Sequence, residues 1–302
     1  VCWTRSWRVE QEGVTVKGSP HFSPDPDAEI LYKAMKGIGT NEQAITDMLT
    51  KRSNAQRQQI SKSFKAQFSK DLTETLKSEL SGKFERLIVA LMYPPYRYEA
   101  KELHDAMKGL GTKEEVIIEI LASRTKHQLW EIMKAYEEDY GSSLEEDIQA
   151  DTSGYLERIL VCLLQGSRDD VSGFVDPELA LQDAQVRLSV FEEYEKIANK
   201  SIEDSIKSET HGSLEEAMLT VGKNSGTVLR CTYGPGTRDG TLIRNIVSRS
   251  EIDLNLIKGE FKKMYGKTLS SMIMVSHEFP IFTPVCDINI TERPRCYDLC
   301  AK

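Results

Sequence analysis

The chain has 302 residues, of which 39% are hydrophobic and 28% charged, with a formal net charge of -8. This composition excludes a mainly disordered chain, and no stretch approaches the ~20 apolar residues that a membrane-spanning helix needs. The acidic balance argues against nucleic acid as a partner and against direct attraction to anionic lipid, because like charges repel. A cation would have to mediate any contact with such a membrane.

The first segment, residues 1–23, is predicted to be an N-terminal tail. Its opening run VCWTRSWRVEQEG lacks the apolar core of about 7–15 residues that a secretory signal contains, so we expect a cytoplasmic protein. Trp3 and Trp7 lie among Arg5 and Arg8 and suit a short arm that touches a protein partner or a membrane. The more common alternative for such a terminus is a disordered tail.

Residues 24–93 and 94–167 contain the same sequence unit twice. The stretch KAMKGIGTNE at 33–42 returns as DAMKGLGTKE at 105–114, an offset of 72 residues, and the apolar stripes that follow at helical spacing keep this offset. Each unit predicts a first helix, a glycine loop and four further helices, and no run alternates at the period of a strand. We therefore expect an all-α fold in which the units pack on one another.

The loop Met-Lys-Gly-x-Gly-Thr in each unit has features of a metal-binding loop. Its two glycines can adopt backbone angles forbidden to other residues, so successive carbonyl oxygens can turn toward one point. Such a cluster suits a hard cation, and calcium takes about six to eight oxygens, commonly including a bidentate carboxylate. Glu79 and Asp151 each lie forty residues beyond the second glycine of their loop. The two copies therefore predict one calcium site each.

The sequence around the loop allows other interpretations and disfavours some of them. Nucleotide binding is disfavoured because the loop lacks G-x-G-x-x-G and G-x-x-x-x-G-K-[ST], and the EF-hand pattern is missing too. Gly-x-Gly-Thr between helices is most often only a tight connection, and a lone acid is more often solvated or a cap. In either interpretation Thr40 and Thr112 suit the N-cap of the following helix, with Gln43 and Glu115 as capping-box partners. The recurrence of loop and acid at one separation favours calcium.

The residues at the loop tips indicate which kind of partner a bound cation would contact. Ile38 and Leu110 lie between the glycines, and Lys36 and Lys108 lie beside them. Local packing and solvated lysines are one explanation. A membrane would use both features, with a shallow apolar tip among the headgroups and lysines facing phosphate. Three neutral carbonyls and one acid leave coordination positions for water or lipid phosphate, so calcium would bridge two anions.

The loop K-G-x-G-T, the acid forty residues later, the R-S/T between helices and the five-helix unit together resemble the annexin family. The resemblance is strong over about 24–185, lacks its first half over 186–221 and is partial over about 234–274. It implies an annexin-like array of five-helix repeats forming a curved disc, with two repeats complete and two incomplete. Calcium loops on the convex face would dock on anionic phospholipid membranes.

The resemblance also implies the residues of each site. In each complete repeat, three backbone carbonyls and one carboxylate would bind calcium: Met35, Gly37, Gly39 and Glu79 in the first, and Met107, Gly109, Gly111 and Asp151 in the second. Weaker accessory metal sites would use Thr40 with Glu42, and Thr112 with Glu114.

The later repeats depart from this pattern. In 168–222 the chain passes from ELALQDAQ directly to VRLSVFEEYEK, so the loop is missing and Glu209, at the acid position, should bind nothing. In 223–275 the loop YGPGT remains. The lysine position is Tyr233 and the acid position is Ser276, so we expect a weak or empty site. The tail 276–302 contains three prolines and should be irregular.

Two functions follow from these observations. The leading hypothesis is a non-enzymatic protein that binds anionic phospholipid when calcium is present and sits peripherally on plasma or endosomal membranes. The resemblance implies an anticoagulant, phospholipase-inhibitory or membrane-organising role. The alternative is a calcium-independent interaction or decoy protein, whose shortened third repeat exposes the apolar residues Val190, Tyr194, Ile202 and Ile206.

Overall fold

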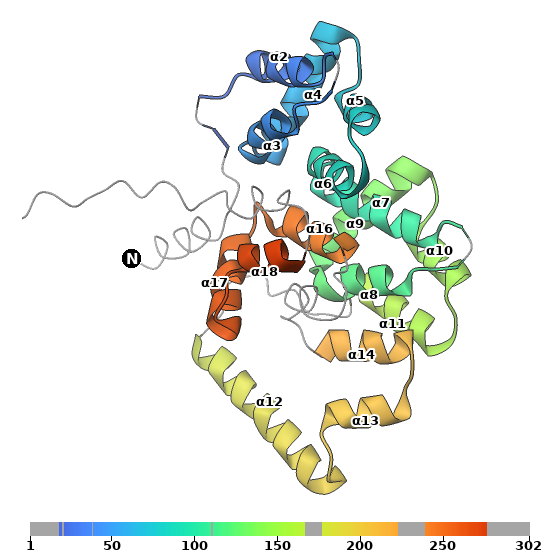
Figure 1. The fold of residues 1–302 in the computed structure, drawn as a ribbon. Coiled ribbons are helices and arrows are strands. Elements are labelled where there is room, and N and C mark those ends of the chain that lie inside the picture. Colours follow the sequence, from blue (N-terminus) through green and yellow to red (C-terminus); the bar gives the residue numbers. More distant parts are fainter. Residues whose placement is uncertain are drawn as a thin grey trace, which may run out of the picture. The chain divides into compact units, whose positions relative to one another are not determined.

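The computed structural model describes residues 18–19, 21–37, 39–109, 111–166, 177–222 and 239–276. These ranges contain helices and no strand, which confirms the predicted all-α fold (Figure 1). Contacts divide the chain into two compact units, Val1–Pro95 with Val228–Lys302, and Tyr96–Thr227. Among the described residues, none of the helices combines the length and the hydrophobicity that a transmembrane helix requires.

The first copy of the sequence unit forms five helices, as predicted. They are α2 (Pro24–Ala34), α3 (Glu42–Thr50), α4 (Asn54–Phe68), α5 (Leu72–Glu79) and α6 (Gly82–Met92). A capping box opens α4, because Ser53 accepts the Gln56 N–H and the Gln56 side chain accepts the Ser53 N–H. Helix α4 packs mainly on α2, where the rings of Tyr32 and Phe68 stack with centroids 4.0 Å apart.

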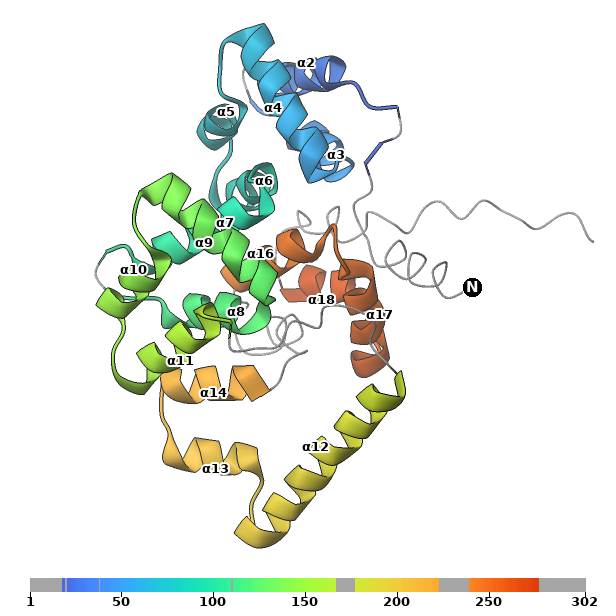
Figure 2. The ribbon, with the colours of Figure 1, turned by 180° about the vertical axis from the view of Figure 1, so that it is seen from behind.

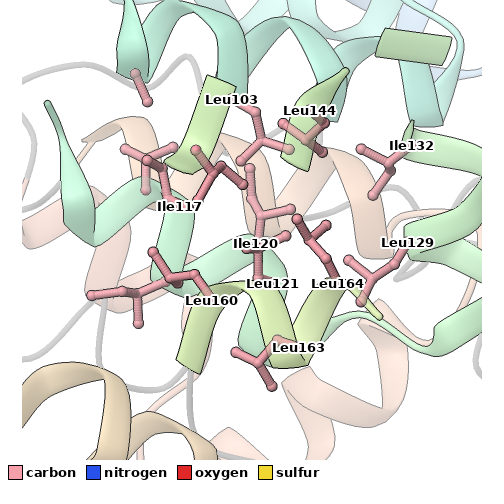
Figure 3. Packing of buried hydrophobic residues seen from close by; sticks show 14 of the residues in the cluster. Leu103, Ile117, Ile120, Leu121, Leu129, Ile132, Leu144, Leu160, Leu163 and Leu164 are labelled. Atoms are coloured by element: carbon pink, nitrogen blue, oxygen red, sulfur yellow. The ribbon is translucent and has the colours of Figure 1, made fainter. Parts of the chain in front are cut away.

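The second copy repeats this arrangement in the other unit. Its helices are α7 (Pro95–Met107), α8 (Glu114–Ser123), α9 (Lys126–Tyr140), α10 (Leu144–Asp151) and α11 (Gly154–Leu164). Thr125 and Gln128 form the same capping box at the start of α9. His104 stacks on Tyr140 with centroids 3.8 Å apart, in place of the first copy's tyrosine and phenylalanine. Aliphatic side chains from all five helices fill the core between them (Figure 3).

The shortened third segment forms α12 (Pro177–Ala198), α13 (Ile202–Glu209) and α14 (Ser213–Gly222). The residues on both sides of the junction at Gln185 and Val186 belong to one helix, α12, which is unbroken in both views (Figures 1 and 2). Helix α14 packs on α8 and α11, whereas α12 packs chiefly on α13. Tyr194 donates a hydrogen bond to Ser205 across the α12–α13 contact.

The fourth segment forms α16 (Asp239–Arg249), α17 (Leu254–Tyr265) and α18 (Leu269–Ser276). Helix α16 packs on α6, and Lys83 pairs with Asp239 at 2.7 Å. The loop with Tyr233, the tail from residue 277 onward and the N-terminal arm with Trp3 and Trp7 lie outside the described residues.

Candidate functional site

The first glycine loop joins α2 to α3 and has an unusual backbone. Gly37 has a φ of 115° and Gly39 a φ of 91°, which side-chain-bearing residues rarely adopt. The loop is closed by the Asn41 N–H, which donates to the carbonyl of Ala34 at 2.8 Å. A Cβ added at either glycine would meet nothing within 4 Å. The glycines are therefore required by the backbone angles and not by lack of space.

The second glycine loop, between α7 and α8, has the same shape. Gly109 has a φ of 113° and Gly111 a φ of 90°. The Lys113 N–H closes this loop on the carbonyl of Ala106 at 2.9 Å. Because two independent copies adopt one conformation, the shape is a property of the shared sequence.

The carbonyl oxygens predicted as metal ligands are available in both loops. Within the described residues, none of them accepts a hydrogen bond; they belong to Met35, Gly37, Gly39, Met107, Gly109 and Gly111. The four glycines are exposed. A backbone carbonyl without a protein partner needs water or a cation, so these oxygens can serve as ligands.

The predicted acid lies at its loop in both copies. Glu79 is the last residue of α5, and the Thr40 hydroxyl donates to its carboxylate at 3.0 Å. Asp151 is the last residue of α10, and the Thr112 hydroxyl donates to its carboxylate at 3.3 Å. Both acids are exposed. Residues 39 apart in sequence are thus joined at the same end of each copy.

The predicted role of the two threonines as N-caps is wrong. Helix α3 is capped by Asn41, which accepts the Ala44 N–H at 3.0 Å, and the N-cap position of α8 is Lys113. In each copy the threonine hydroxyl instead donates to the acid that ends α5 or α10 of the same repeat. Consequently Gln43 and Glu115 do not complete capping boxes. The equal spacing of threonine and acid in both copies was the signal that would have revealed this contact.

The remaining predicted residues are the accessory acids, the loop lysines and the tip residues. Glu42 and Glu114 are the first residues of α3 and α8, and among the described residues no side-chain hydrogen bond joins either to its threonine. Lys36 and Lys108 are exposed, and the Lys36 ammonium lies 5.6 Å from the Tyr32 ring centroid. The tip residues Ile38 and Leu110 lie outside the described residues.

The donor set limits which ion these loops suit. No group of three or more His, Cys, Asp or Glu side chains that could hold a metal occurs in the described ranges. A metal at either loop would therefore be held mainly by backbone carbonyl oxygens and a single carboxylate. Oxygen-only sites of this kind suit hard cations such as calcium rather than zinc or copper.

Comparison with known proteins identifies the class. The annexin family model matches residues 26–91, 98–163, 179–221 and 229–277, so the chain belongs to the annexin family. It is 78% identical over 309 aligned positions to human annexin A8, covering 91% of this chain and 94% of that protein.

Solved structures agree with this assignment. One of an annexin A8 mutant with an intact N-terminus has a TM-score of 0.80 at 74% identity, covering 93% of this chain and 98% of that one. One described as calcium-bound annexin (Sm)1 has a TM-score of 0.71 at 31% identity, covering 91% and 92%.

Proposed function

We propose that this annexin binds anionic phospholipid membranes in a calcium-dependent manner through the glycine loops of its first two repeats. The observation that supports this most is the repeated geometry. In both copies the predicted carbonyl ligands accept no hydrogen bond from the residues that the structure describes, and the loop threonine donates to the predicted acid. A relative at 31% identity is described as calcium-bound, which agrees with the same ion here.

The same observations support a ligand set for each site. The carbonyls of Met35, Gly37 and Gly39 with the Glu79 carboxylate would form the first site. The corresponding set in the second repeat is Met107, Gly109, Gly111 and Asp151. Calcium bound there would supply the positive charge that links the acidic protein to lipid phosphate. Lys36 and Lys108 stand beside the loops and would add direct phosphate contacts.

Six segments would divide the chain in this proposal: the tail 1–23, complete repeats 24–93 and 94–167, a truncated repeat 168–222, a partial repeat 223–275 and the tail 276–302. The protein would act without catalysis, in the cytoplasm and reversibly on plasma or endosomal membranes. Covering lipid in this way would produce an anticoagulant, phospholipase-inhibitory or membrane-organising role. The N-terminal tail would be the segment that engages a protein partner.

Sedimentation with phosphatidylserine vesicles across a calcium titration tests this function. The wild-type chain should pellet with the vesicles only when calcium is present, and the double variant Glu79→Gln/Asp151→Asn should not. Glu209→Gln is the matched control, because Glu209 ends α13 as Asp151 ends α10 but belongs to the repeat whose loop is missing. Failure of folded wild-type protein to pellet at millimolar calcium would contradict the proposal.

A second candidate function, calcium-independent protein interaction, is favoured by one observation. The α12–α13 region exposes Val190 by 60%, Ile197 by 80% and Ile202 by 38%. Tyr194 and Ile206, also expected to be exposed, are partly buried. Exposed apolar residues of this kind favour association. A gel-filtration size well above 34.2 kDa in a calcium chelator, reduced to monomer size by Ile197→Glu, would support this function, and a monomeric wild-type chain would oppose it.

A further inference from the structure

We propose that Tyr155 and Arg158 form an additional membrane contact beside the second glycine loop, where the aromatic ring and guanidinium enter the headgroup layer. The Tyr155 side chain is 70% exposed, and the Arg158 guanidinium carbon lies 5.6 Å from the centre of its ring. Both residues lie on α11. The inference rests on the proposed function, since calcium at the loop is what brings this end of the repeat to lipid.

The position of Tyr155 places the pair at the same end of the repeat as the candidate metal site. Helix α10 ends at Asp151 and α11 begins at Gly154, directly before Tyr155. The Thr112 hydroxyl ties Asp151 to the glycine loop. Leu156 and Leu160 are buried in the core of the repeat and hold α11 with the Tyr155 and Arg158 positions outward.

The chemistry of the pair suits a lipid interface better than plain water. Tyrosine has an apolar ring and a polar hydroxyl, a combination enriched at membrane interfaces. Arginine binds phosphate with a planar fork of donors, and stacking on an aromatic ring restricts the side chain before binding. An anionic phospholipid surface offers both an acyl-chain boundary for the ring and phosphates for the guanidinium.

The first repeat lacks this membrane contact because its corresponding residues contact the start of α16 instead. Lys83 and Arg86 lie 72 positions before Tyr155 and Arg158. Lys83 forms an ion pair with Asp239 at 2.7 Å. Arg86 lies beside Gly240, with a guanidinium nitrogen 3.1 Å from where a Cβ on that glycine would be. In the first repeat these positions pack against α16, so of the two complete repeats it is the second that would present them to lipid.

The test compares Tyr155→Ala with Trp130→Ala in vesicle binding at fixed calcium. Trp130 is a matched control: its side chain is 55% exposed, the Lys134 ammonium lies 5.7 Å from its ring, and α9 contributes no residue to either candidate site. Tyr155→Ala should weaken affinity for phosphatidylserine vesicles about tenfold, which corresponds to about 1.4 kcal/mol, because the interfacial ring is lost. Trp130→Ala should bind like wild type.

Calcium binding without vesicles, measured by titration calorimetry, separates lipid contact from damage to the metal site. Tyr155→Ala should leave it unchanged, and Arg158→Ala should give a smaller vesicle defect of the same kind. If wild type binds vesicles and Tyr155→Ala binds equally well, this inference is overturned and the proposed function stands. If wild type itself does not bind vesicles with calcium, both are overturned. Weaker calcium binding by Tyr155→Ala in the absence of lipid would also overturn the inference.

Discussion

Single residues determine the shape of the two loops. Gly37 and Gly39 adopt positive φ angles in open space, as do Gly109 and Gly111. Nothing but the backbone conformation therefore opposes a larger side chain at these positions. The effect of an added methyl group isolates that conformational requirement.

Alanine substitution tests this requirement. Gly111→Ala should destabilise the protein by about 1–2 kcal/mol, because alanine is strained at positive φ. Gly259→Ala is the control, since Gly259 lies within α17 at an ordinary helical conformation with no atom within 4 Å of an added Cβ. That change should stabilise the protein by about 1 kcal/mol. Denaturant unfolding measures both, and equal effects of the two substitutions would contradict the account.

The residue scale is also where sequence-based prediction failed. The glycines and acids could be proposed as ligands because their types and spacing are informative by themselves. The threonines were assigned to helix caps because capping rules consider only near neighbours. In the fold, Thr40 and Thr112 donate hydrogen bonds to acids 39 residues away. This contact could be predicted only by comparing the two copies, in which threonine and acid have the same separation.

One buried side chain joins α4 of the first repeat to the segment after α16. Arg57 is 1% exposed and donates to the carbonyls of Leu91 at 2.8 Å and Leu49 at 3.1 Å, and to Glu251 at 3.3 Å. Burial lowers the pKa of Arg57 to about 10, and Glu251 opposes that shift in part. The guanidinium therefore remains charged at neutral pH and depends on these acceptors.

Removal of this side chain should be costly. Arg57→Ala should lower the free energy of unfolding by about 3–5 kcal/mol, because the buried carbonyls lose their donor. Arg97→Ala removes an arginine that pairs with Glu138 and Asp139 at the surface, and should cost less than about 1 kcal/mol. Thermal or denaturant unfolding distinguishes the two. Equal losses would show that Arg57 contributes no more than a surface ion pair.

At the scale of elements, the repeat offset predicted most of the fold. Each of the first two copies has five helices, and the starts of α3, α5 and α6 return in α8, α10 and α11 with the expected spacing of 72 residues. Helix α12 crosses the junction of the shortened repeat as one helix, which was not predicted. The signal was present, because residues 178–198 contain neither glycine nor proline and nothing interrupts a helix there.

Helix α12 should be the least protected long helix of its unit. It packs chiefly on α13, whereas α9 buries Leu129, Ile132 and Tyr136 in the repeat core. Local opening requires less energy where few apolar contacts are broken. Hydrogen exchange should therefore be faster for α12 amides than for α9 amides. Equal protection in a monomeric sample would contradict this expectation.

For the whole molecule, the central proposal is that one chain carries two calcium sites of the same kind. Linked sites that bind one membrane at the same time raise overall affinity by roughly 10²–10⁴ over a single site. The third repeat has Glu209 without a loop, and the fourth ends α18 at Ser276 where α5 ends at Glu79. The two complete repeats should therefore carry the membrane binding of the chain.

Counting the calcium ions bound per chain in the presence of phosphatidylserine vesicles, by equilibrium dialysis, tests this claim most directly. Glu79→Gln and Asp151→Asn should each remove one bound ion, the double variant should remove both, and Glu209→Gln should remove none. A count that is unchanged by the two loop acids, or that falls equally with Glu209→Gln, would contradict the assignment of the sites to the first two repeats.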